Sequence, residues 1–239
     1  IPYDQLVVAT GASPYRPDVP GINGETVLGV QTLTDAQRLL DRNLRGRPRD
    51  VVVVGGGYVG LEMAETYVRL GATVTVVDQA PEIMGTLDPD MGALVRTAMV
   101  RHGIEVRCGT AVTAFEPGSV HLANGDTLTA DLVVLGTGVA PNSRLAADAG
   151  VDTGVKGAIR VNQRQQTGTD GIWAAGDCAE SHHLVSRLPV HLPLGTVANR
   201  QARVAGINLG GGYATFPGVV GTAVTKLCAT EVARTGLSE

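Results

Sequence analysis

The chain has 239 residues, of which 44% are hydrophobic and 18% charged, and this balance supports a packed core of one or two domains and excludes a mainly disordered chain. A net charge of −4, a single Trp and no apolar run near the roughly 20 residues of a membrane span argue against nucleic-acid and membrane partners. Three scattered cysteines without a CxxC pair favour a reducing, cytoplasmic setting over a disulfide framework.

In the first half of the chain, strands and helices alternate. A short strand is expected near residues 5–10, and Thr34 and Gln37 have the spacing of a capping box that begins a helix ending near residue 43. The β-branched run at 51–54 predicts a strand buried on both faces. A helix at 61–70 and a strand at 72–78 complete one βαβ unit.

A helix at 88–102 opens the second half. Short strands near 105–107, 111–115 and 120–122, with a turn at Asn124-Gly125, are typical of an antiparallel meander inserted before a parallel strand at 132–136. The later elements are expected to be a helix at 143–149, strands at 158–161 and 171–175, and a helix at 195–208. The alternating tail at 219–232 predicts the opening strand of another domain.

The strongest motif is G-x-G-x-x-G at residues 55–60, made of Gly55, Gly57 and Gly60 with Tyr58 and Val59 between them. It follows a buried strand and opens a helix, which is the context in which such a turn binds a dinucleotide pyrophosphate at the helix N-terminus. Asp78 follows Gly60 by 78 − 60 = 18 residues and ends the next strand. A carboxylate there accepts hydrogen bonds from the adenosine ribose and repels a 2′-phosphate, and residues 79–82 supply no cation, so NAD(H) is favoured over NADP(H).

Two further glycine motifs follow buried strands. GTGVAPN at 136–142 includes Gly136 and Gly138, which would let the backbone approach the nicotinamide side of the nucleotide. In GIWAAGDCAE at 171–180, a strand ends at Gly176-Asp177, where the Asp can accept a hydrogen bond from a polyol hydroxyl of a cofactor.

Together with ATGASP near the start, VVVVGGGYVGLEMAE and LPLGTVANRQARVAG, these motifs resemble the pyridine nucleotide-disulphide oxidoreductases. The tail FPGVVGTAVTKLCATEVARTGLSE resembles the start of the interface domain in the NADH oxidase, NADH peroxidase and coenzyme A-disulphide reductase branch. The resemblance implies Rossmann-like three-layer FAD/NAD(P)-binding domains of the α/β class, with a parallel sheet, helices on one side and an antiparallel meander on the other. The implied segments are 1–20 and 139–213 for FAD, 21–138 for NAD, and 214–239 for the interface domain.

The resemblance also implies roles for individual residues. Tyr58 would be an aromatic gate over the flavin, and Glu62 would line the nicotinamide side. FAD would contact residues near the start of the chain, after the strand at 171–175 and at the start of the helix at 195: Thr10, Gly11, Gly176, Asp177, Gly195, Thr196 and Ala198.

Because the chain begins with Ile1 and opens directly into a strand, we expect it to be a piece of a longer protein. The family's FAD-binding G-x-G-x-x-G and its redox Cys would precede this segment, so we expect no catalytic residue here and no activity of the chain by itself. We expect Cys108, Cys178 and Cys228 to be packing or surface residues. The histidines 182, 183 and 191 lack further ligands, and no metal site is expected.

The resemblance implies a homodimeric enzyme in which NADH passes hydride to FAD and electrons continue to a Cys-based centre, disulphide, peroxide or oxygen. Two alternatives share some of the motifs. An NADH-dependent reductase of ferredoxin or rubredoxin would carry every nucleotide motif, but the tail from Phe216 favours the oxidase and disulphide-reductase branch. A non-catalytic NAD-binding sensor would not require the FAD motif at Asp177.

Overall fold

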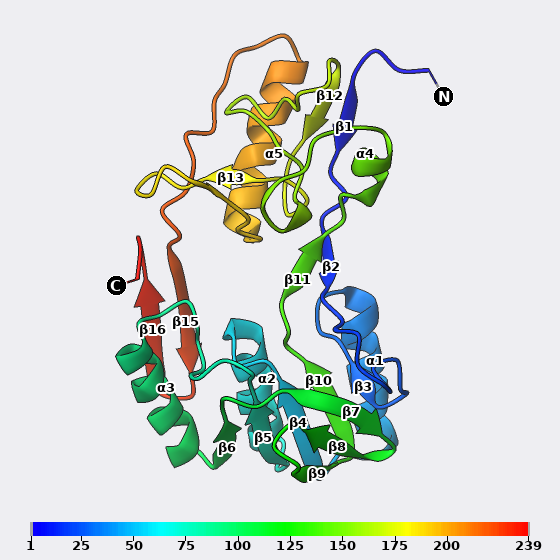
Figure 1. Ribbon diagram of the computed structural model, residues 1–239, viewed down its shortest axis with the longest axis vertical. Helices are drawn as coiled ribbons and strands as arrows, with labels where there is room; N and C mark the ends of the chain where they lie inside the picture. Colours follow the sequence, from blue (N-terminus) through cyan, green and yellow to red (C-terminus); the bar gives the residue numbers. More distant parts are fainter. Residues whose placement is uncertain (1, 239) are drawn as a thin grey trace. The chain divides into compact units, whose positions relative to one another are not determined.

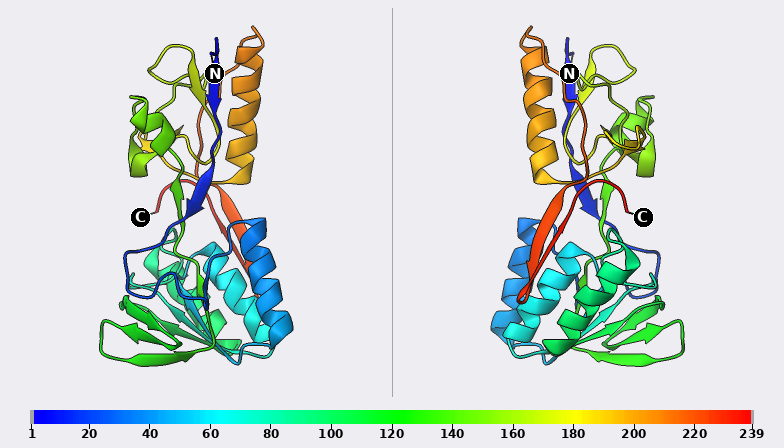
Figure 2. Two further views of the ribbon diagram at one scale, coloured as in Figure 1. Left: turned by 90° about the vertical axis from the view of Figure 1, so that its right-hand side faces the viewer. Right: turned by 90° about the vertical axis from the view of Figure 1, so that its left-hand side faces the viewer.

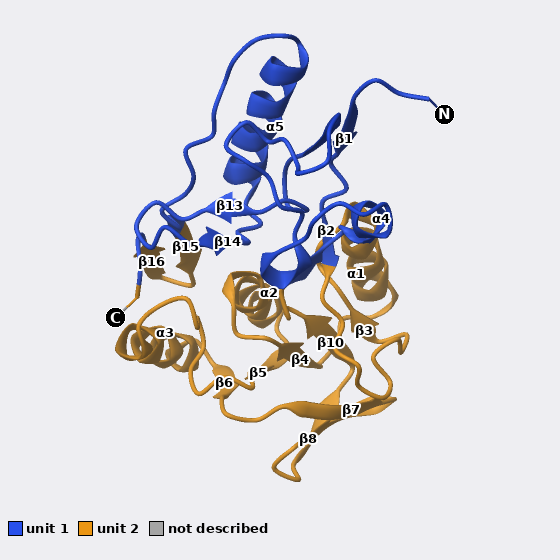
Figure 3. Ribbon diagram, turned by 45° about the horizontal axis from the view of Figure 1, so that its top comes forward, with its two compact units in different colours: residues 1–13, 139–223, 235–237 blue, residues 14–138, 224–234, 238–239 orange. Residues whose placement is uncertain are grey.

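The computed structural model describes residues 2–238, which form two compact units (Figure 3). Unit 1 contains residues 2–13, 139–223 and 235–237, and unit 2 contains residues 14–138, 224–234 and 238. None of the helices within residues 2–238 is long and apolar enough to cross a membrane. The expected division into FAD, NAD and interface segments remains a prediction.

A parallel five-stranded sheet forms the centre of unit 2. Its strand order is β3-β10-β4-β5-β6, with bounds Val27–Leu28, Leu132–Leu135, Asp50–Val54, Thr73–Val77 and Ile104–Arg107. Val53 of β4 lies opposite Val76 of β5 and Val134 of β10, so branched side chains line up across the middle of the sheet. Such side chains suit strands that are covered on both faces.

The two faces of this sheet build two separate cores. Val51 and Val53 pack with Leu61 and Met99 under the helices α1 (Leu33–Arg45), α2 (Tyr58–Arg69) and α3 (Pro89–Arg101). The other face is covered by the meander of β7 (Val112–Glu116), β8 (Gly118–Leu122) and β9 (Thr127–Ala130) (Figures 1 and 2). Val52 belongs to the core on that face. The three-layer α/β fold is therefore confirmed.

Two local predictions for unit 2 were wrong. The strand near 105–107 is not part of the meander: β6 pairs in parallel with β5, because burial of Ile104 among the helices places it in the main sheet. The first helix is capped two residues earlier than expected. Thr32 is the N-cap, its hydroxyl accepts the Asp35 N–H at 3.1 Å, and Asp35 accepts the Thr32 N–H at 2.9 Å.

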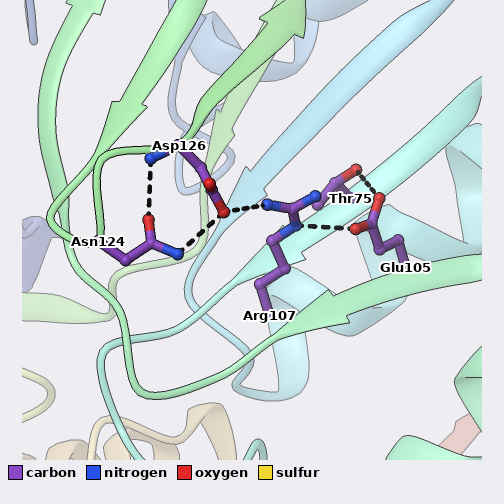
Figure 4. A network of polar contacts seen from close by, with 5 residues as sticks. All are labelled: Thr75, Glu105, Arg107, Asn124 and Asp126. Carbon is purple, nitrogen blue, oxygen red and sulfur yellow. Dashed lines mark hydrogen bonds and ion pairs between the residues drawn. The ribbon is translucent and has the colours of Figure 1, made fainter.

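A polar network ties the edge of the parallel sheet to the meander (Figure 4). The Arg107 guanidinium donates through Nε to Glu105 and through Nη1 to Asp126, at 2.8 Å in both cases. Asn124 donates to the same Asp126 carboxylate at 2.9 Å, and Thr75 donates to Glu105 at 3.2 Å. The turn between β8 and β9 is thereby held beside the end of β6.

Unit 1 is built from short strands, two helices and a 3-10 turn. Its strands form three pairs: β1 (Leu6–Val8) with β12 (Ile172–Ala174) in parallel, β2 (Ala12–Pro14) with β11 (Val139–Pro141), and β13 (Ser181–His182) with β14 (Pro189–Val190). Its helices are α4 (Arg144–Asp148) and α5 (Gly195–Leu209), and a 3-10 turn lies at Val155–Gly157. The strand expected at 158–161 is absent from the described structure. Ile159 makes only isolated bridges to Thr153 and Ala179, since its neighbours find no continuous partner strand.

The tail forms a hairpin instead of a single strand. β15 (Ala223–Leu227) and β16 (Thr230–Arg234) are joined by a turn in which Cys228 has a φ of 56°. Leu227 and Val232 are buried in the core on the helix side of the unit 2 sheet, which is why residues 224–234 belong to unit 2.

Candidate functional site

The glycine-rich turn at 55–60 joins β4 to α2. Gly55 has a φ of 104°, a conformation that favours glycine, and its N–H donates to the Val77 carbonyl at 2.8 Å. Gly57 is the N-cap of α2, and no side chain caps this helix. A Cβ on Gly57 would meet no heavy atom within 4 Å. The first N–H groups of α2 are thus open to an anionic ligand, as a pyrophosphate site requires.

Asp78 is held against this turn. Its Oδ2 accepts the Gly56 N–H at 2.6 Å, and its Oδ1 accepts the Ala80 N–H at 2.8 Å. A carboxylate has about four lone-pair positions, so two remain for further donors such as ribose hydroxyls. The structure therefore brings together the two parts of the motif that the sequence spacing paired.

The loop with Gly136 and Gly138 lies beside the glycine-rich turn at 55–60. The Gly136 N–H donates to the Val54 carbonyl at 2.8 Å, and a Cβ on Gly136 would lie 2.7 Å from the Cα of Gly60. Gly138 has a φ of 82°, and a Cβ there would meet no heavy atom within 4 Å. Since parallel strands end at a common edge, the loops after β4, β5 and β10 form one continuous rim.

The first turns of α2 carry the remaining NAD candidates. Val59 is 43% exposed, and the Tyr58 hydroxyl lies 3.5 Å from the Thr86 hydroxyl. Glu62 is exposed, and its carboxylate accepts the Thr225 hydroxyl at 2.6 Å. Sequence reasoning missed Thr225, because no local pattern marks a partner 163 residues away.

A second group of candidates surrounds Gly176 and Asp177 in unit 1. The Gly176 N–H donates to Gln201 Oε1 at 2.9 Å, and Gln201 is fully buried. His191 Nε2 lies 2.7 Å from the Asp177 carbonyl oxygen, and because a carbonyl only accepts, the ring nitrogen carries the proton. The Asp177 carboxylate has no partner among the described residues. Gln201 and His191 therefore fix the backbone of this loop and leave its carboxylate available.

The other expected FAD contacts also lie in unit 1. Gly195 and Thr196 open α5, whose N-terminus has no side-chain cap, and a Cβ on Gly176 would lie 3.7 Å from the Ala198 Cβ. Thr10 and Asn142 are tied together: the Thr10 hydroxyl donates to the Asn142 carbonyl, and Asn142 Nδ2 donates to the Thr10 carbonyl at 2.9 Å. Gly11 has a φ of 67° and open space at its Cβ position.

The cysteines do not have the environment of a redox centre. All three are free, and Cys178 is buried with its thiol donating to the Val8 carbonyl at 3.4 Å. Burial raises the pKa of the Cys108 and Cys228 thiols, and Glu82 and Glu65 respectively add to that rise. A raised pKa disfavours the reactive thiolate. Within residues 2–238, no group of His, Cys, Asp and Glu is arranged to hold a metal ion.

Comparison with known proteins shows which family the chain matches. Residues 1–202 match the family model described as pyridine nucleotide-disulphide oxidoreductase. The chain is 36% identical to an NAD(P)H sulfur oxidoreductase (CoA-dependent) of Pyrococcus abyssi and 37% identical to an NADH oxidase of Methanocaldococcus jannaschii, covering 99% of this chain in both cases and 54% and 53% of the relatives. The chain thus spans about half the length of these curated relatives.

A solved structure shows the same arrangement. The structure of an FAD-dependent pyridine nucleotide-disulphide oxidoreductase from Desulfovibrio vulgaris superposes with a TM-score of 0.90 at 37% identity. The similarity covers all of this chain and 62% of that one. The fold is therefore shared with a protein of this kind.

Proposed function

The chain belongs to the pyridine nucleotide-disulphide oxidoreductase family, and we propose that it carries the NADH-binding domain and part of the FAD-binding domain of an FAD-dependent NADH oxidoreductase. The observation that carries this proposal is the pairing of Asp78 with the Gly56 N–H at 2.6 Å beside the uncapped start of α2. The carboxylate suits the hydroxyls of an adenosine ribose, and the open helix N-terminus at the same rim suits the pyrophosphate attached to that ribose.

Each candidate in unit 2 has a role in holding NADH. The α2 N-terminus at Gly57 would bind the pyrophosphate, and Asp78 would accept hydrogen bonds from the adenosine ribose. The loop with Gly136 and Gly138 would form a wall on the nicotinamide side, where Tyr58 and Glu62 would also lie. The exposure of Glu62 and the open space at Gly57 and Gly138 support these roles.

The residues of unit 1 fit a flavin. The free carboxylate of Asp177 suits a polyol hydroxyl, and the uncapped N-terminus of α5 suits an electron-rich ring edge, because its dipole favours negative charge. Thr10 and Gly11 would contact the same group where β1 ends. Bound FAD would supply the acceptor for hydride from NADH and the route for electrons to the final acceptor.

The full protein would be a homodimer acting on a small acceptor. The relatives are named NAD(P)H sulfur oxidoreductase and NADH oxidase, and these names support a sulfur compound or oxygen as the acceptor class. The raised pKa values of the Cys108 and Cys228 thiols disfavour the thiolate that a redox Cys would need. A cytoplasmic location and the absence of nucleic-acid or membrane partners belong to the same proposal.

Titration calorimetry of the purified chain tests the nucleotide site directly. We expect saturable NADH binding and at least tenfold weaker NADPH binding, because a 2′-phosphate would lie against the Asp78 carboxylate. ADP-ribose should bind as well, since it keeps the groups that Asp78 and the α2 N-terminus contact. Equal affinities for NADH and NADPH, or no binding of either, would contradict the proposal.

A further inference from the structure

Residues 224–234 of the hairpin β15–β16 belong to unit 2, and the hairpin contacts α2 through two hydrogen bonds and a shared apolar core (Figure 3). Leu227 and Val232 of the hairpin are buried in the same core as Leu61 and Ala64 of the helix. This apolar contact holds the hairpin against the helix. The polar groups of the hairpin therefore have fixed positions relative to α2.

Polar contacts follow the same helix face. The Thr225 hydroxyl donates to Glu62 Oε1 at 2.6 Å, and the Cys228 N–H donates to Glu65 Oε2 at 2.8 Å. Tyr58 precedes Glu62 by four residues, and residues at that spacing lie next to each other on a helix. The expected gate therefore lies next to the expected nicotinamide-side carboxylate, which the hairpin contacts directly.

Thr225 controls where the Glu62 carboxylate lies. Thr225 is 9% exposed, so its hydroxyl is held in place by the packing of β15, whereas Glu62 is exposed and its side chain has no comparable packing. Among the described residues, Thr225 is the one donor to the Glu62 carboxylate. A hydrogen bond to an ionised acceptor is short and strong, and here it occupies one lone pair of Oε1. Oε2 remains free to accept another donor.

We propose that Thr225 is a positioning residue of the nucleotide site, which holds the Glu62 carboxylate ready to accept the amide N–H of the nicotinamide carboxamide. This inference rests on the proposed role of Glu62 and adds the hairpin to the site. A long Glu side chain that is already ordered loses less rotamer freedom when the ligand binds. The hairpin thus contributes to affinity for the nicotinamide half without contacting the nucleotide.

Calorimetry with two ligands separates this role from a structural one. ADP-ribose has the adenosine and pyrophosphate of NADH but no nicotinamide. In the 239-residue chain, Thr225→Val removes the hydroxyl and keeps the β-branched shape. It should weaken NADH binding roughly three- to tenfold, the cost of ordering one long side chain when the ligand binds, and leave ADP-ribose binding unchanged. Thr225→Ser keeps the hydroxyl and should restore NADH affinity.

A double variant completes the test. In a Glu62→Ala background, Thr225→Val should cause no further loss of NADH affinity. Equal loss for NADH and ADP-ribose, or no loss for either, would overturn the positioning role while leaving the nucleotide site intact. If the unsubstituted chain binds neither ligand, the proposed function itself fails, and the inference fails with it.

Discussion

Gly55 and Gly136 lie in direct backbone contact: a Cβ on Gly55 would be 2.4 Å from the Gly136 carbonyl oxygen. These residues follow β4 and β10, two neighbouring strands that are far apart in sequence. The contact leaves no room for a side chain, and the φ of 104° at Gly55 independently favours glycine. The rim of the proposed nucleotide site therefore depends on close contact between these two glycines.

Gly55→Ala should destabilise unit 2 by roughly 1–3 kcal/mol through backbone strain alone, with more from the contact at Gly136. Gly57→Ala is the matched control, since Gly57 has a φ of −82° and open space at its Cβ position. The control should lose under about 1 kcal/mol of stability, at the N-cap, but bind NADH more weakly. Urea unfolding followed by circular dichroism and NADH titration measure both effects; equal unfolding curves for the two variants would contradict the contact.

Asp78→Ala should weaken NADH binding about ten- to a hundredfold, because it removes charge-assisted hydrogen bonds worth roughly 1.5–3 kcal/mol. Gln79→Arg places a cation beside the ribose and should raise NADPH affinity. Glu116→Ala, at an exposed position on the meander, should change neither affinity. Calorimetry measures all three variants, and unchanged NADH affinity in Asp78→Ala would remove Asp78 from the site.

Leu227→Ala should destabilise unit 2 by about 2–5 kcal/mol, because Leu227 is fully buried in the helix-side core. Val224→Ala lies on the same strand but is 75% exposed, so it should change stability by less than about 0.5 kcal/mol. Urea unfolding compares the two variants. Similar small effects would show that the hairpin does not dock as described.

Asp131 should make stability depend on pH. Its Oδ2 accepts the backbone N–H groups of Arg49 at 2.8 Å and Asp50 at 3.2 Å, and these bonds hold the pKa of its carboxyl below the usual range. Because the folded pKa is lowered, the stabilisation is present above the unfolded pKa of about 3.9 and is lost as the pH falls through the folded value.

Asp131→Asn should therefore lower stability at pH 7 and approach the unsubstituted chain as the pH falls below about 4. Asp18→Asn, at an exposed residue without a hydrogen bond among the described residues, serves as the control. Urea unfolding at pH 7 and pH 3 provides the measurement. A loss of stability in Asp131→Asn that stays constant with pH would contradict the assigned hydrogen bonds.

The 239-residue chain, expressed by itself, should be colourless and should not oxidise NADH. Unit 1 offers a flavin the Asp177 carboxylate and the α5 N-terminus, but β1 and β12 form a parallel pair without a further strand in the described structure. The hydrogen bonds to the FAD pyrophosphate are expected from the family's other G-x-G-x-x-G, which is not in this chain. Each such charge-assisted bond is worth roughly 1.5–3 kcal/mol, so without several of them the affinity for FAD should fall by many orders of magnitude. A flavin absorbance band with NADH turnover in the purified chain would overturn this expectation.

The sequence alone was sufficient for the βαβ unit that carries the main motif. The run of valines at 51–54, the glycine turn and Asp78 follow from hydropathy and backbone conformation over fewer than thirty residues, and the structure contains them as a βαβ unit. Periodicity over short segments could not decide which sheet β6 joins, because a short strand has the same pattern in a meander and in a parallel sheet.

Only the tertiary structure decided which polar side chains meet. Gln201 supports Gly176, and Thr225 supports Glu62, across 25 and 163 residues of sequence. Secondary-structure propensity depends on residues that are neighbours in the sequence, so the sequence shows it as a local pattern. A hydrogen bond between distant residues depends instead on how two segments pack against a common core. The backbone of the site was therefore predictable from the sequence, but the groups that orient its side chains were not.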